Sequence, residues 1–371
     1  MRDRRLSVRI EQSDPIPIDV DFTCNPGDVL AIFGPSGSGK TTILRTIAGL
    51  YRPLRALVRS GDETWTDTAA GTATPVHRRA IGFVFQEYAL FPHLTAAGNV
   101  MTALGDRPRR ERRERAQALL DLVHLSGRTS RRPHELSGGE RQRVAVARAL
   151  AREPDVLLMD EPFAAVDRAV RRGLQNDIDT LRRELRVPMI LVTHDFDDVV
   201  RLATHVLLLE RGIMVASGPI GSLMSRPDLT FLRNAVGLGS VFEAHVSASY
   251  AERGLTELTF AGGSLLSADL GLPRGTPIRI RIPAREVILA SAPPVGLSLH
   301  NVLSGIIAAV HADAASEHAT VQIAVGSVLL LAEVTRDAVA RLHITEGAPI
   351  HALVKSVSVD VRQVADVSHS A

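Results

Sequence analysis

The feature that most limits the fold of this chain is a short apolar run, Val29–Phe33, followed directly by a glycine-rich turn. The turn reads Gly34-Pro-Ser-Gly-Ser-Gly-Lys40-Thr41 and satisfies the phosphate-binding P-loop pattern at every fixed position. Glycines allow several backbone N–H groups to point at one phosphate cluster, and a helical run from Thr42 adds the positive end of its dipole. We therefore predict a strand–loop–helix unit of an α/β fold that holds nucleotide phosphates. Its expected contact residues are Gly34, Pro35, Ser36, Gly37, Ser38, Gly39, Lys40, Thr41 and Thr42.

Two side chains at the end of this turn have distinct expected roles. Lys40 supplies a point charge to the β- and γ-phosphates, and the Thr41 hydroxyl is a ligand for Mg²⁺. Lysine is rare in this chain, because only Lys40 and Lys355 are lysines among 43 Lys and Arg residues. A position that keeps lysine in such a chain either needs a compact ammonium group or keeps it by chance.

A second apolar run, Val156–Asp160, ends in the carboxylate pair Asp160-Glu161. Ligands of open α/β sheets bind outside the carboxyl ends of the strands, so we expect both carboxylates beside the P-loop. Asp160 is predicted to hold Mg²⁺, directly or through water, and Glu161 to act as general base on the attacking water. The pattern is weak alone, but its place downstream of a complete P-loop strengthens it.

A third motif, Leu136-Ser-Gly-Gly-Glu-Arg-Gln142, precedes a helical run that continues through Ala151. Ser137, Gly138 and Gly139 open this helix with free N–H groups, which is a second design for binding phosphate. One domain needs only one phosphate cradle for one nucleotide. We therefore predict that the stretch from Ser137 to Glu140 covers a nucleotide held by a second copy of the chain, which implies a homodimer.

Length and residue pattern divide the chain into domains. With 371 residues, it is too long for one compact core. Residues 1–235 alternate apolar strands with amphipathic helices and predict a mostly parallel sheet, with a helical insertion at about 87–150. Short β-rich runs separated by Gly and Pro then predict all-β modules at 240–290 and 296–361. The expected strands are Val29–Phe33, Ile81–Phe85, Val156–Asp160, Met189–Thr193, His205–Glu210, Pro277–Ile282, Thr320–Ile323, Val328–Val334 and Ile350–Val359.

Charge, hydropathy and cysteine content exclude several classes of protein. The net charge of +2 does not provide an electrostatic funnel for nucleic acid. The basic run Arg107–Arg115 contains Glu residues and leads into an amphipathic helix, so we interpret it as a solvated helix face rather than a nucleic-acid or lipid surface. No apolar run is long enough to span a bilayer, and Met1–Ile10 lacks the apolar stretch of a secretion signal. The single cysteine, Cys24, excludes an intrachain disulfide and fits a reducing cytoplasm.

The order of these motifs resembles the ABC ATPase family over residues 1–235. The third motif is similar to the family signature, with Glu140 where the commonest form has Gln. The resemblance implies that Gln86 is the Q-loop residue, which senses Mg²⁺ and links to the membrane subunit. It further implies that Asp167 is the D-loop aspartate and that His194 is the switch histidine that contacts the γ-phosphate.

One departure from this family concerns adenine. Family members usually stack the base on an aromatic ring upstream of the P-loop. The matching region, Pro15–Ile18, contains no aromatic residue. We therefore expect only an apolar contact from Ile16.

The C-terminal part resembles a molybdate-binding (Mop-type) module. The resemblance rests on Gly296–Gly305, similar to the opening of such modules, and on Leu353–Val357, similar to their closing strand. In that family, Ser, Arg and Asn from the first motif and Lys-Ser from the second bind a tetrahedral oxyanion between paired modules. The matching residues here are Ser298, His300, Asn301, Lys355 and Ser356. Because His300 replaces the Arg and lacks its fixed charge and fork, we expect oxyanion binding to be weak or lost.

As a whole, the chain resembles the ATPase subunits of molybdate importers. The implied fold is a P-loop NTPase domain of ABC type with an inserted helical subdomain, followed by a C-terminal all-β, OB-like (Mop/TOBE) domain. The implied cofactors are ATP and Mg²⁺. The implied partners are a second copy, integral membrane permease subunits, an extracytoplasmic solute-binding protein met indirectly, and regulatory molybdate, but no nucleic acid. The implied location is peripheral, on the cytoplasmic face of the inner membrane.

Other functions stay open at this stage. The same motor would serve an importer of sulfate, tungstate or another small solute. A soluble ABC ATPase acting on DNA or ribosomes predicts coiled-coil insertions or two cassettes in one chain, and neither is visible. A third hypothesis is an oxyanion sensor whose ATPase activity is secondary.

Overall fold

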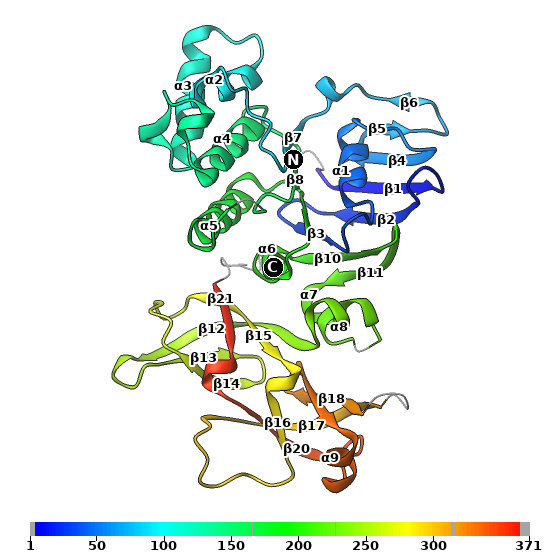
Figure 1. Ribbon diagram of the computed structural model, residues 1–371, viewed down its shortest axis with the longest axis vertical. Coiled ribbons are helices and arrows are strands. Elements are labelled where there is room, and N and C mark those ends of the chain that lie inside the picture. Colours follow the sequence, from blue (N-terminus) through cyan, green and yellow to red (C-terminus); the bar gives the residue numbers. More distant parts are fainter. Residues whose placement is uncertain (1–3, 165, 227, 313–316, 364–371) are drawn as a thin grey trace. The chain divides into compact units, whose positions relative to one another are not determined.

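The computed structural model describes residues 4–164, 166–226, 228–312 and 317–363 (Figure 1). The chain divides into two compact units, one ending at Gly218 and the other beginning at Pro219. Each unit encloses its own hydrophobic core. Among the described residues, the structure contains no helix with the length and apolar character needed to span a bilayer.

The first unit is built on one eleven-stranded sheet with the order β6-β5-β4-β1-β2-β11-β10-β3-β9-β8-β7. Strands β10, β3, β9, β8 and β7 run parallel, whereas β2, β1, β4, β5 and β6 are antiparallel. Every residue of β3, β8 and β9 is buried, as expected for parallel strands covered on both faces. The strands are β1 (Leu6–Gln12), β2 (Ile18–Cys24), β3 (Val29–Phe33), β4 (Arg55–Ser60), β5 (Glu63–Asp67), β6 (Thr72–Ala73), β7 (Ile81–Val84), β8 (Val156–Asp160), β9 (Met189–Thr193), β10 (His205–Glu210) and β11 (Ile213–Pro219).

Helices pack on this sheet and also form a cluster of their own. The helix α1 follows β3, whereas α2, α3 and α4 gather at one end of the sheet, where α4 packs against β7 (Figure 1). On α3 and the two residues before it, ion pairs at i,i+4 join Arg107 to Glu111 and Arg110 to Glu114, each at 2.9 Å and solvent-exposed. The interpretation of this run as a solvated helix face is therefore confirmed. The helices are α1 (Lys40–Ala48), α2 (Ala96–Met101), α3 (Arg109–Leu122), α4 (Gly138–Leu150), α5 (Arg168–Leu185) and α6 (Phe196–Leu202).

A buried arginine fixes the helix that follows the P-loop. The guanidinium of Arg79 donates hydrogen bonds to the carbonyls of Thr46 and Ile47 at the end of α1, and to the carbonyl of Trp65 on β5. Arg79 is 2% exposed and Trp65 is completely buried. A cation at the negative end of a helix satisfies carbonyls that have no partner within the helix. Trp65 is thus a core residue of the antiparallel part.

The second unit consists of two antiparallel sheets, with the orders β14-β13-β12-β15-β21 and β16-β20-β17-β18-β19. Side chains of both sheets share one core, among them Phe260, Ile280, Val321 and Ile350. Its elements are α7 (Ile220–Met224), α8 (Thr230–Val236), β12 (Gly239–Tyr250), β13 (Leu255–Phe260), β14 (Gly263–Ala268), β15 (Pro277–Pro283), β16 (Val287–Ala290), β17 (Asn301–Ala312), β18 (His318–Val325), β19 (Val328–Thr335), α9 (Arg336–Arg341), β20 (Pro349–Val354) and β21 (Asp360–Gln363).

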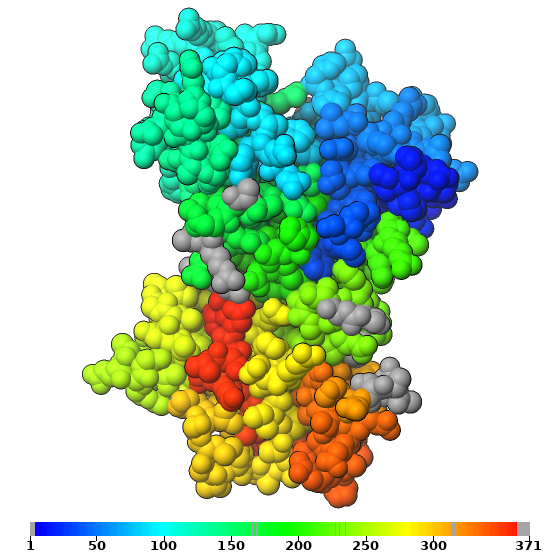
Figure 2. Space-filling model, viewed as in Figure 1, coloured from blue at the N-terminus to red at the C-terminus, as the bar shows by residue number. Residues whose placement is uncertain are grey.

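The last strands differ from the sequence prediction. The predicted strand Ile350–Val359 is confirmed as far as Val354 and wrong beyond it, because β20 ends there and a 3₁₀ turn occupies Ser356–Ser358. The chain then enters the other sheet, where β21 pairs with β15. In Figure 2 this C-terminal segment, coloured red, lies against the yellow strands of the same unit. The break leaves Lys355 at the point where the chain changes sheets.

Candidate nucleotide-binding site

The parallel strands of the first unit end together at one edge of the sheet. In the register, Phe33 of β3 pairs with Thr193 of β9, and Asp160 of β8 pairs with Val192. The neighbouring β7 ends at Val84, which pairs with Met159. The residues that follow these strands therefore meet at the same edge: the P-loop after β3, Glu161 after β8, His194 after β9 and Gln86 after β7.

The P-loop turns tightly into α1. Gly37 and Gly39 have φ values of 79° and 95°, a left-handed conformation that glycine adopts without strain. Gly39 caps α1 without any side-chain hydrogen bond, so the first N–H groups of the helix stay available to a ligand. The Ser38 hydroxyl is buried and has no hydrogen-bond partner among the described residues. An orphaned buried hydroxyl and uncapped N–H groups both fit a phosphate ligand.

Lys40, Thr41 and Asp160 lie together beneath this loop. Lys40 is 5% exposed, and its Nζ donates hydrogen bonds to the carbonyls of Gly34 at 2.9 Å and Pro35 at 2.7 Å. Thr41 Oγ1 donates to Asp160 Oδ1 at 3.0 Å. A hydroxyl and a carboxylate oxygen at this distance are the hard donors that Mg²⁺ prefers.

The burial of these groups shifts their proton affinities. Burial raises the pKa of Asp160, with the Thr41 hydrogen bond acting in the opposite direction. Burial lowers the pKa of Lys40, and the nearby carboxylates of Glu161 and Asp160 oppose that shift. Both directions reflect charges held in a partly dehydrated site. A bound triphosphate and a cation would supply the missing counter-charges.

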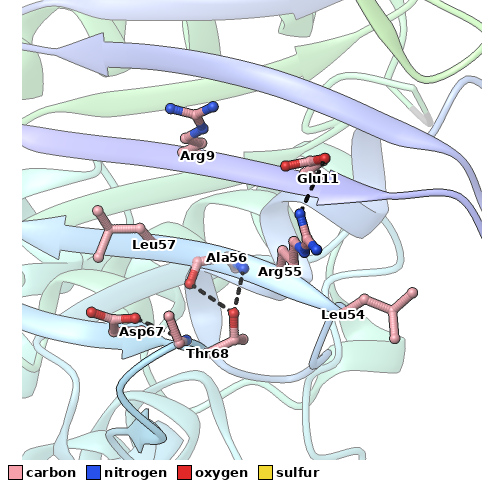
Figure 3. Close-up of a pocket in the computed structure, with 9 residues that line it drawn as sticks. Arg9, Glu11, Leu54, Arg55, Ala56, Leu57, Asp67 and Thr68 are labelled. Atoms are coloured by element: carbon pink, nitrogen blue, oxygen red, sulfur yellow. Dashed lines mark hydrogen bonds and ion pairs between the residues drawn. The ribbon is translucent and has the colours of Figure 1, made fainter.

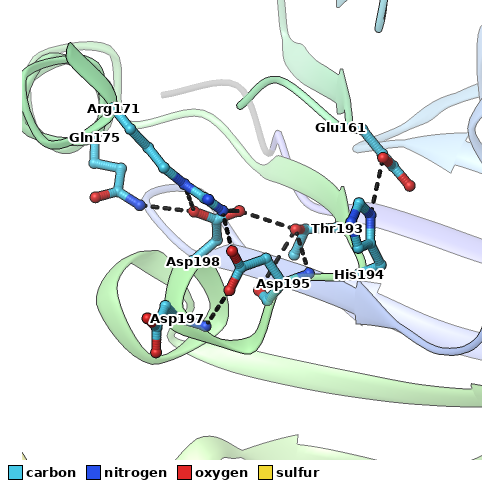
Figure 4. Close-up of polar contacts among 8 residues, drawn as sticks. All are labelled: Glu161, Arg171, Gln175, Thr193, His194, Asp195, Asp197 and Asp198. Atoms are coloured by element: carbon cyan, nitrogen blue, oxygen red, sulfur yellow. Dashed lines mark hydrogen bonds and ion pairs between the residues drawn. The ribbon is translucent and has the colours of Figure 1, made fainter. Parts of the chain in front are cut away.

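Glu161 and His194 form a direct pair at the same edge (Figure 4). Glu161 Oε2 lies 3.0 Å from His194 Nδ1. The backbone of Glu161 has a φ of 45°, which is strained for a residue with a side chain, and its N–H donates to the Val192 carbonyl at 2.9 Å. The Glu161 side chain is 17% exposed and that of His194 is 57% exposed. The pair therefore reaches from the sheet edge to solvent.

The structure places the third motif at the start of α4. Ser137 and Glu140 form a capping box, in which Ser137 Oγ accepts from the Glu140 N–H at 3.3 Å and Glu140 Oε2 accepts from the Ser137 N–H at 2.8 Å. Glu140 also receives a hydrogen bond from Arg128 at 2.9 Å. The Ser137 backbone bond and Arg128 hold the pKa of Glu140 below its usual range. Among the described residues, no hydrogen bond or ion pair joins this motif to the P-loop.

Close packing explains why position 139 of this motif is glycine. Gly139 is buried against the first turn of α5, where a Cβ atom would collide with Cγ1 of Val170. Asp167, directly before α5, accepts a hydrogen bond from the Val170 N–H at 3.1 Å. Gly139 of the third motif and the D-loop aspartate Asp167 thus both contact Val170.

Ile16, the residue upstream of the P-loop that is expected to contact adenine, lies next to the loop. Ile16 is 36% exposed and lies beside Gly39, where an added Cβ would be 3.8 Å from Ile16 Cγ2. The Gln12 amide donates to the Ile16 carbonyl at 2.7 Å and to the Tyr51 hydroxyl at 2.9 Å. Sequence reasoning missed Gln12 and Tyr51, because their contact joins positions 39 residues apart.

An apolar groove lies beside the turn that contains Gln86. It has a volume of about 410 Å³ and is lined mainly by Ile81, Phe83, Phe85, Ala89, Phe91 and Arg148. Phe83 and Phe85 stack with ring centroids 4.2 Å apart, and Phe91 is 45% exposed. Gln86 itself is exposed. We name this surface the Phe91 groove.

A second cavity lies on the solvent face of the antiparallel strands (Figure 3). Its lining includes Arg9 and Glu11 of β1, Arg55 of β4 and Asp67 of β5. An ion pair joins Arg55 to Glu11 at 3.7 Å, between highly exposed side chains. None of the predicted nucleotide-site residues lines this cavity, and its chemistry suggests no ligand.

In the second unit, the structure brings together part of the predicted oxyanion site. His300 Nδ1 lies 3.1 Å from Ser356 Oγ, and Lys355 and Ser298 are exposed. Asn301 is 3% exposed, and its side-chain amide bonds both to the N–H of Leu266 at 2.6 Å and to its carbonyl at 2.9 Å. The Asn301 side chain therefore ties β17 to β14.

The comparisons with known proteins agree with this arrangement. The ABC transporter family model matches residues 18–164, and the TOBE domain model matches residues 298–361. The chain is 42% identical over 345 residues to a molybdenum import ATP-binding protein ModC of Thiobacillus denitrificans, covering 92% of this chain and 93% of the relative. It is 39% identical over 362 residues to a protein of the same name from Paramagnetospirillum magneticum, covering 98% of this chain and 99% of the relative.

Solved structures resemble the first unit. The ATP-binding cassette MJ0796, in a dimeric post-hydrolysis state bound to ADP and Pi, covers 58% of this chain and 98% of its own, with 30% identity and a TM-score of 0.50. A P-loop helix, a carboxylate pair at the end of β8 and a second, exposed helix start at Ser137 together define an ATP-binding-cassette ATPase. The chain belongs to the ABC transporter family, and within it to the molybdenum import ATP-binding proteins.

Proposed function

We propose that this ABC ATPase drives the import of molybdate across the cytoplasmic membrane. The observation that carries its ATPase role is the convergence of Lys40, Thr41, Asp160, Glu161 and His194 at one sheet edge. The observation that favours molybdate is the shared name of relatives that align with more than nine tenths of the chain. Sulfate, tungstate or another small solute is the second candidate substrate, because the ATPase does not contact the cargo.

In this proposal, the loop from Gly34 to Thr42 holds the phosphates of ATP. The N–H groups of the loop and of the first turn of α1 face the phosphate oxygens, and the Lys40 ammonium leaves its two carbonyl partners for the β- and γ-phosphates. Thr41 and Asp160 hold Mg²⁺, with Gln86 as a further contact. When bound, the ion neutralises phosphate charge. Ile16 supplies the contact to adenine.

Glu161 acts as the general base for hydrolysis. Its carboxylate accepts a proton from the attacking water while His194 Nδ1 holds the other side of the same group. The imidazole, more than half exposed, is then free to reach the γ-phosphate through its other nitrogen. The strained φ of Glu161 keeps the carboxylate aimed at this edge.

The site is completed by a second copy of the chain. Ser137, Gly138, Gly139 and Glu140 cover the nucleotide of the partner, with Asp167 at the same interface. Two features support this: the helix start is exposed at Ser137, and a similar cassette forms a dimer with ADP and Pi. The capping box already pairs the N–H groups of Ser137 and Glu140, so the remaining N–H groups of the first turn are the available donors.

The Phe91 groove is the docking site for the permease. An apolar groove with an exposed Phe91 and two half-buried phenylalanines fits an amphipathic helix of a membrane subunit. The chain would then sit on the cytoplasmic face of the membrane, and an extracytoplasmic solute-binding protein would meet only the permease. In the second unit, Ser298, His300, Lys355 and Ser356 form a weak regulatory oxyanion site, in which the buried Asn301 has a supporting role.

Two variants test the ATPase proposal. Lys40→Ala is expected to weaken ATP binding by roughly ten- to a hundredfold, because a charge-assisted contact to phosphate is lost. Glu161→Gln is expected to keep ATP binding and to lower kcat by about 10²- to 10⁴-fold. The measurements are nucleotide binding and ATP turnover with the membrane subunits. Glu184→Gln, an exposed glutamate at the end of α5, is the matched control. Normal hydrolysis by Glu161→Gln would refute the assignment of the base.

A further inference from the structure

A buried ionic cluster lies behind the Glu161–His194 pair (Figure 4). At its centre is Asp198 of α6, which is 1% exposed. One oxygen accepts from Arg171 Nε at 3.0 Å and from Gln175 at 2.7 Å, and the other accepts from Arg171 Nη2 at 2.7 Å and from Thr193 at 2.9 Å. Arg171 and Gln175 belong to α5, so the cluster joins α5 to α6.

This cluster holds the chain on both sides of His194. Thr193, directly before it, donates to Asp198. Asp195, directly after it, receives an ion pair from Arg171 Nη2 at 2.7 Å and caps α6 by accepting from the Asp197 N–H. The backbone at His194 is therefore fixed from two directions by groups that Arg171 organises.

Arg171 also contacts the segment that carries Glu161. Its guanidinium lies 5.9 Å from the ring centroid of Phe163, a side chain that is 1% exposed and two residues beyond Glu161. Arg171 thus contacts the segments that follow both members of the Glu161–His194 pair, at Phe163 and at Asp195. It lies on the first turn of α5, which follows Asp167 and packs against Gly139 through Val170.

We propose that Arg171 is a positioning residue for hydrolysis, which sets the distance between Glu161 and His194 and links it to the start of α5. This inference rests on the proposed function of that pair. A planar, bidentate fork suits the task, because it holds Asp198 in one orientation while the same nitrogen reaches Asp195. Lysine keeps the charge but not the fork. Burial raises the pKa of Asp198, which Arg171 counteracts, so removing the guanidinium leaves a buried carboxylate poorly compensated.

The test is a double-mutant cycle. Arg171→Lys is expected to lower kcat about tenfold with little change in the KM for ATP, because small displacements of a catalytic pair affect chemistry more than binding. In a His194→Ala background, the same substitution is expected to change kcat less than about twofold, since the pair it positions is already broken. Additive effects of the two substitutions, or a raised KM with unchanged kcat, would overturn the proposal.

Controls separate positioning from stability. Arg182→Lys alters another poorly exposed arginine of α5, which pairs with Asp179 at 3.1 Å, and is expected to leave kcat unchanged. Asp195→Asn removes the charge of one ion-pair partner of Arg171 at a more exposed position and keeps a helix cap, so it carries the test if Arg171→Lys does not fold. It is expected to lower kcat several-fold at an unchanged melting temperature, and normal kcat in Asp195→Asn would contradict the proposal.

Glu161→Gln, measured in parallel, separates the assignment of Glu161 as the general base from the positioning role of Arg171. Loss of hydrolysis in Glu161→Gln together with normal kcat in Arg171→Lys and Asp195→Asn would overturn only the positioning role. Retained hydrolysis in Glu161→Gln would overturn the assignment of the base, whatever the Arg171 variants do.

Discussion

At the scale of single residues, the structure gives a physical reason why position 40 is lysine in a chain that otherwise uses arginine almost everywhere. The Lys40 ammonium is almost completely buried and reaches the carbonyls of Gly34 and Pro35 together. A rigid guanidinium could not fold back into so small a loop, whereas a compact ammonium can turn toward a phosphate. Lys355 differs, because it is exposed at the point where β20 ends.

The residues of the nucleotide site were predictable because local motifs carry them. Lys40, Thr41, Asp160 and Glu161 each stand at a fixed place relative to an apolar strand, and their proximity follows from strand register alone. Arg171 was not predictable, because its role depends on contacts with Asp198, 27 residues away, and on the packing of two helices. No local pattern encodes such a contact.

Cys24 gives a prediction at the residue scale. Burial raises the pKa of its thiol to about 12, and the charge of Asp28 adds to the shift. At pH 8 only roughly one thiol in ten thousand would be ionised, so the native protein is expected to be inert to a disulfide reagent. Absorbance after adding the reagent measures this, with a sample unfolded in guanidinium as the control. Native labelling at the rate of the unfolded sample would contradict the expectation.

At the scale of elements, the buried parallel strands of the first unit and the antiparallel strands β15, β18 and β19 of the second were predicted, whereas the antiparallel strands of the first unit were not. Strands such as β3, β8 and β9 are continuous apolar runs, which stand out in a sequence. Strands β1 and β2 alternate buried and exposed residues, a weaker signal, and β5 depends on the buried Arg79 that holds it to α1. The break at Lys355 was missed because residues on both sides of it favour β structure.

The turn between β7 and α2 gives a prediction at this scale. Tyr88 and Ala89 have φ values of 62° and 47°, each costing about 1–3 kcal/mol. Arg148 of α4 compensates by donating to their carbonyls, at 2.8 Å and 2.6 Å, and it also lines the Phe91 groove. Without the Arg148 guanidinium, the turn is expected to relax, and the hydrogen bonds that join the turn to α4 are lost.

Arg148→Ala is therefore expected to reduce the ratio of permease-stimulated to basal ATPase about fivefold or more, the size of a typical coupling between sites. Amide hydrogen exchange at residues 86–91 should become faster. Arg152→Ala removes another guanidinium that lines the groove but bonds to the His77 carbonyl rather than to the turn, and should have a smaller effect. Equal effects of the two substitutions would show that stimulation by the permease depends on the guanidinium groups that line the groove and not on the bonds of Arg148 to the turn.

At the scale of the whole molecule, two units with separate cores divide the chemistry. The first unit contains all of the residues proposed for ATP binding and hydrolysis, and the second contains the residues that resemble an oxyanion module. The sequence predicted an α/β part and a β-rich part from a change in residue pattern, but it placed the end of the first part at residue 235 rather than at Gly218. It did not predict that strands β16 and β21 would each join the sheet of the other predicted module, because strand pairing over long separations has no local signal.

The oxyanion site of the second unit supports the last prediction. His300 is exposed and contacts Ser356, the residue after Lys355, so an arginine at this position would place a charged donor beside the predicted oxyanion ligands. His300→Arg is expected to bind molybdate about tenfold more tightly than the parent chain, because a charged donor adds about 1.4 kcal/mol over a neutral one. Equilibrium dialysis of the full chain with molybdate, tungstate and sulfate measures this, and Lys355→Ala in the His300→Arg background should remove the gain. His343→Arg, at an exposed histidine of the same unit, controls for added charge alone. If His300→Arg and His343→Arg bind molybdate with equal affinity, then histidine in place of arginine at position 300 is not the cause of weak binding.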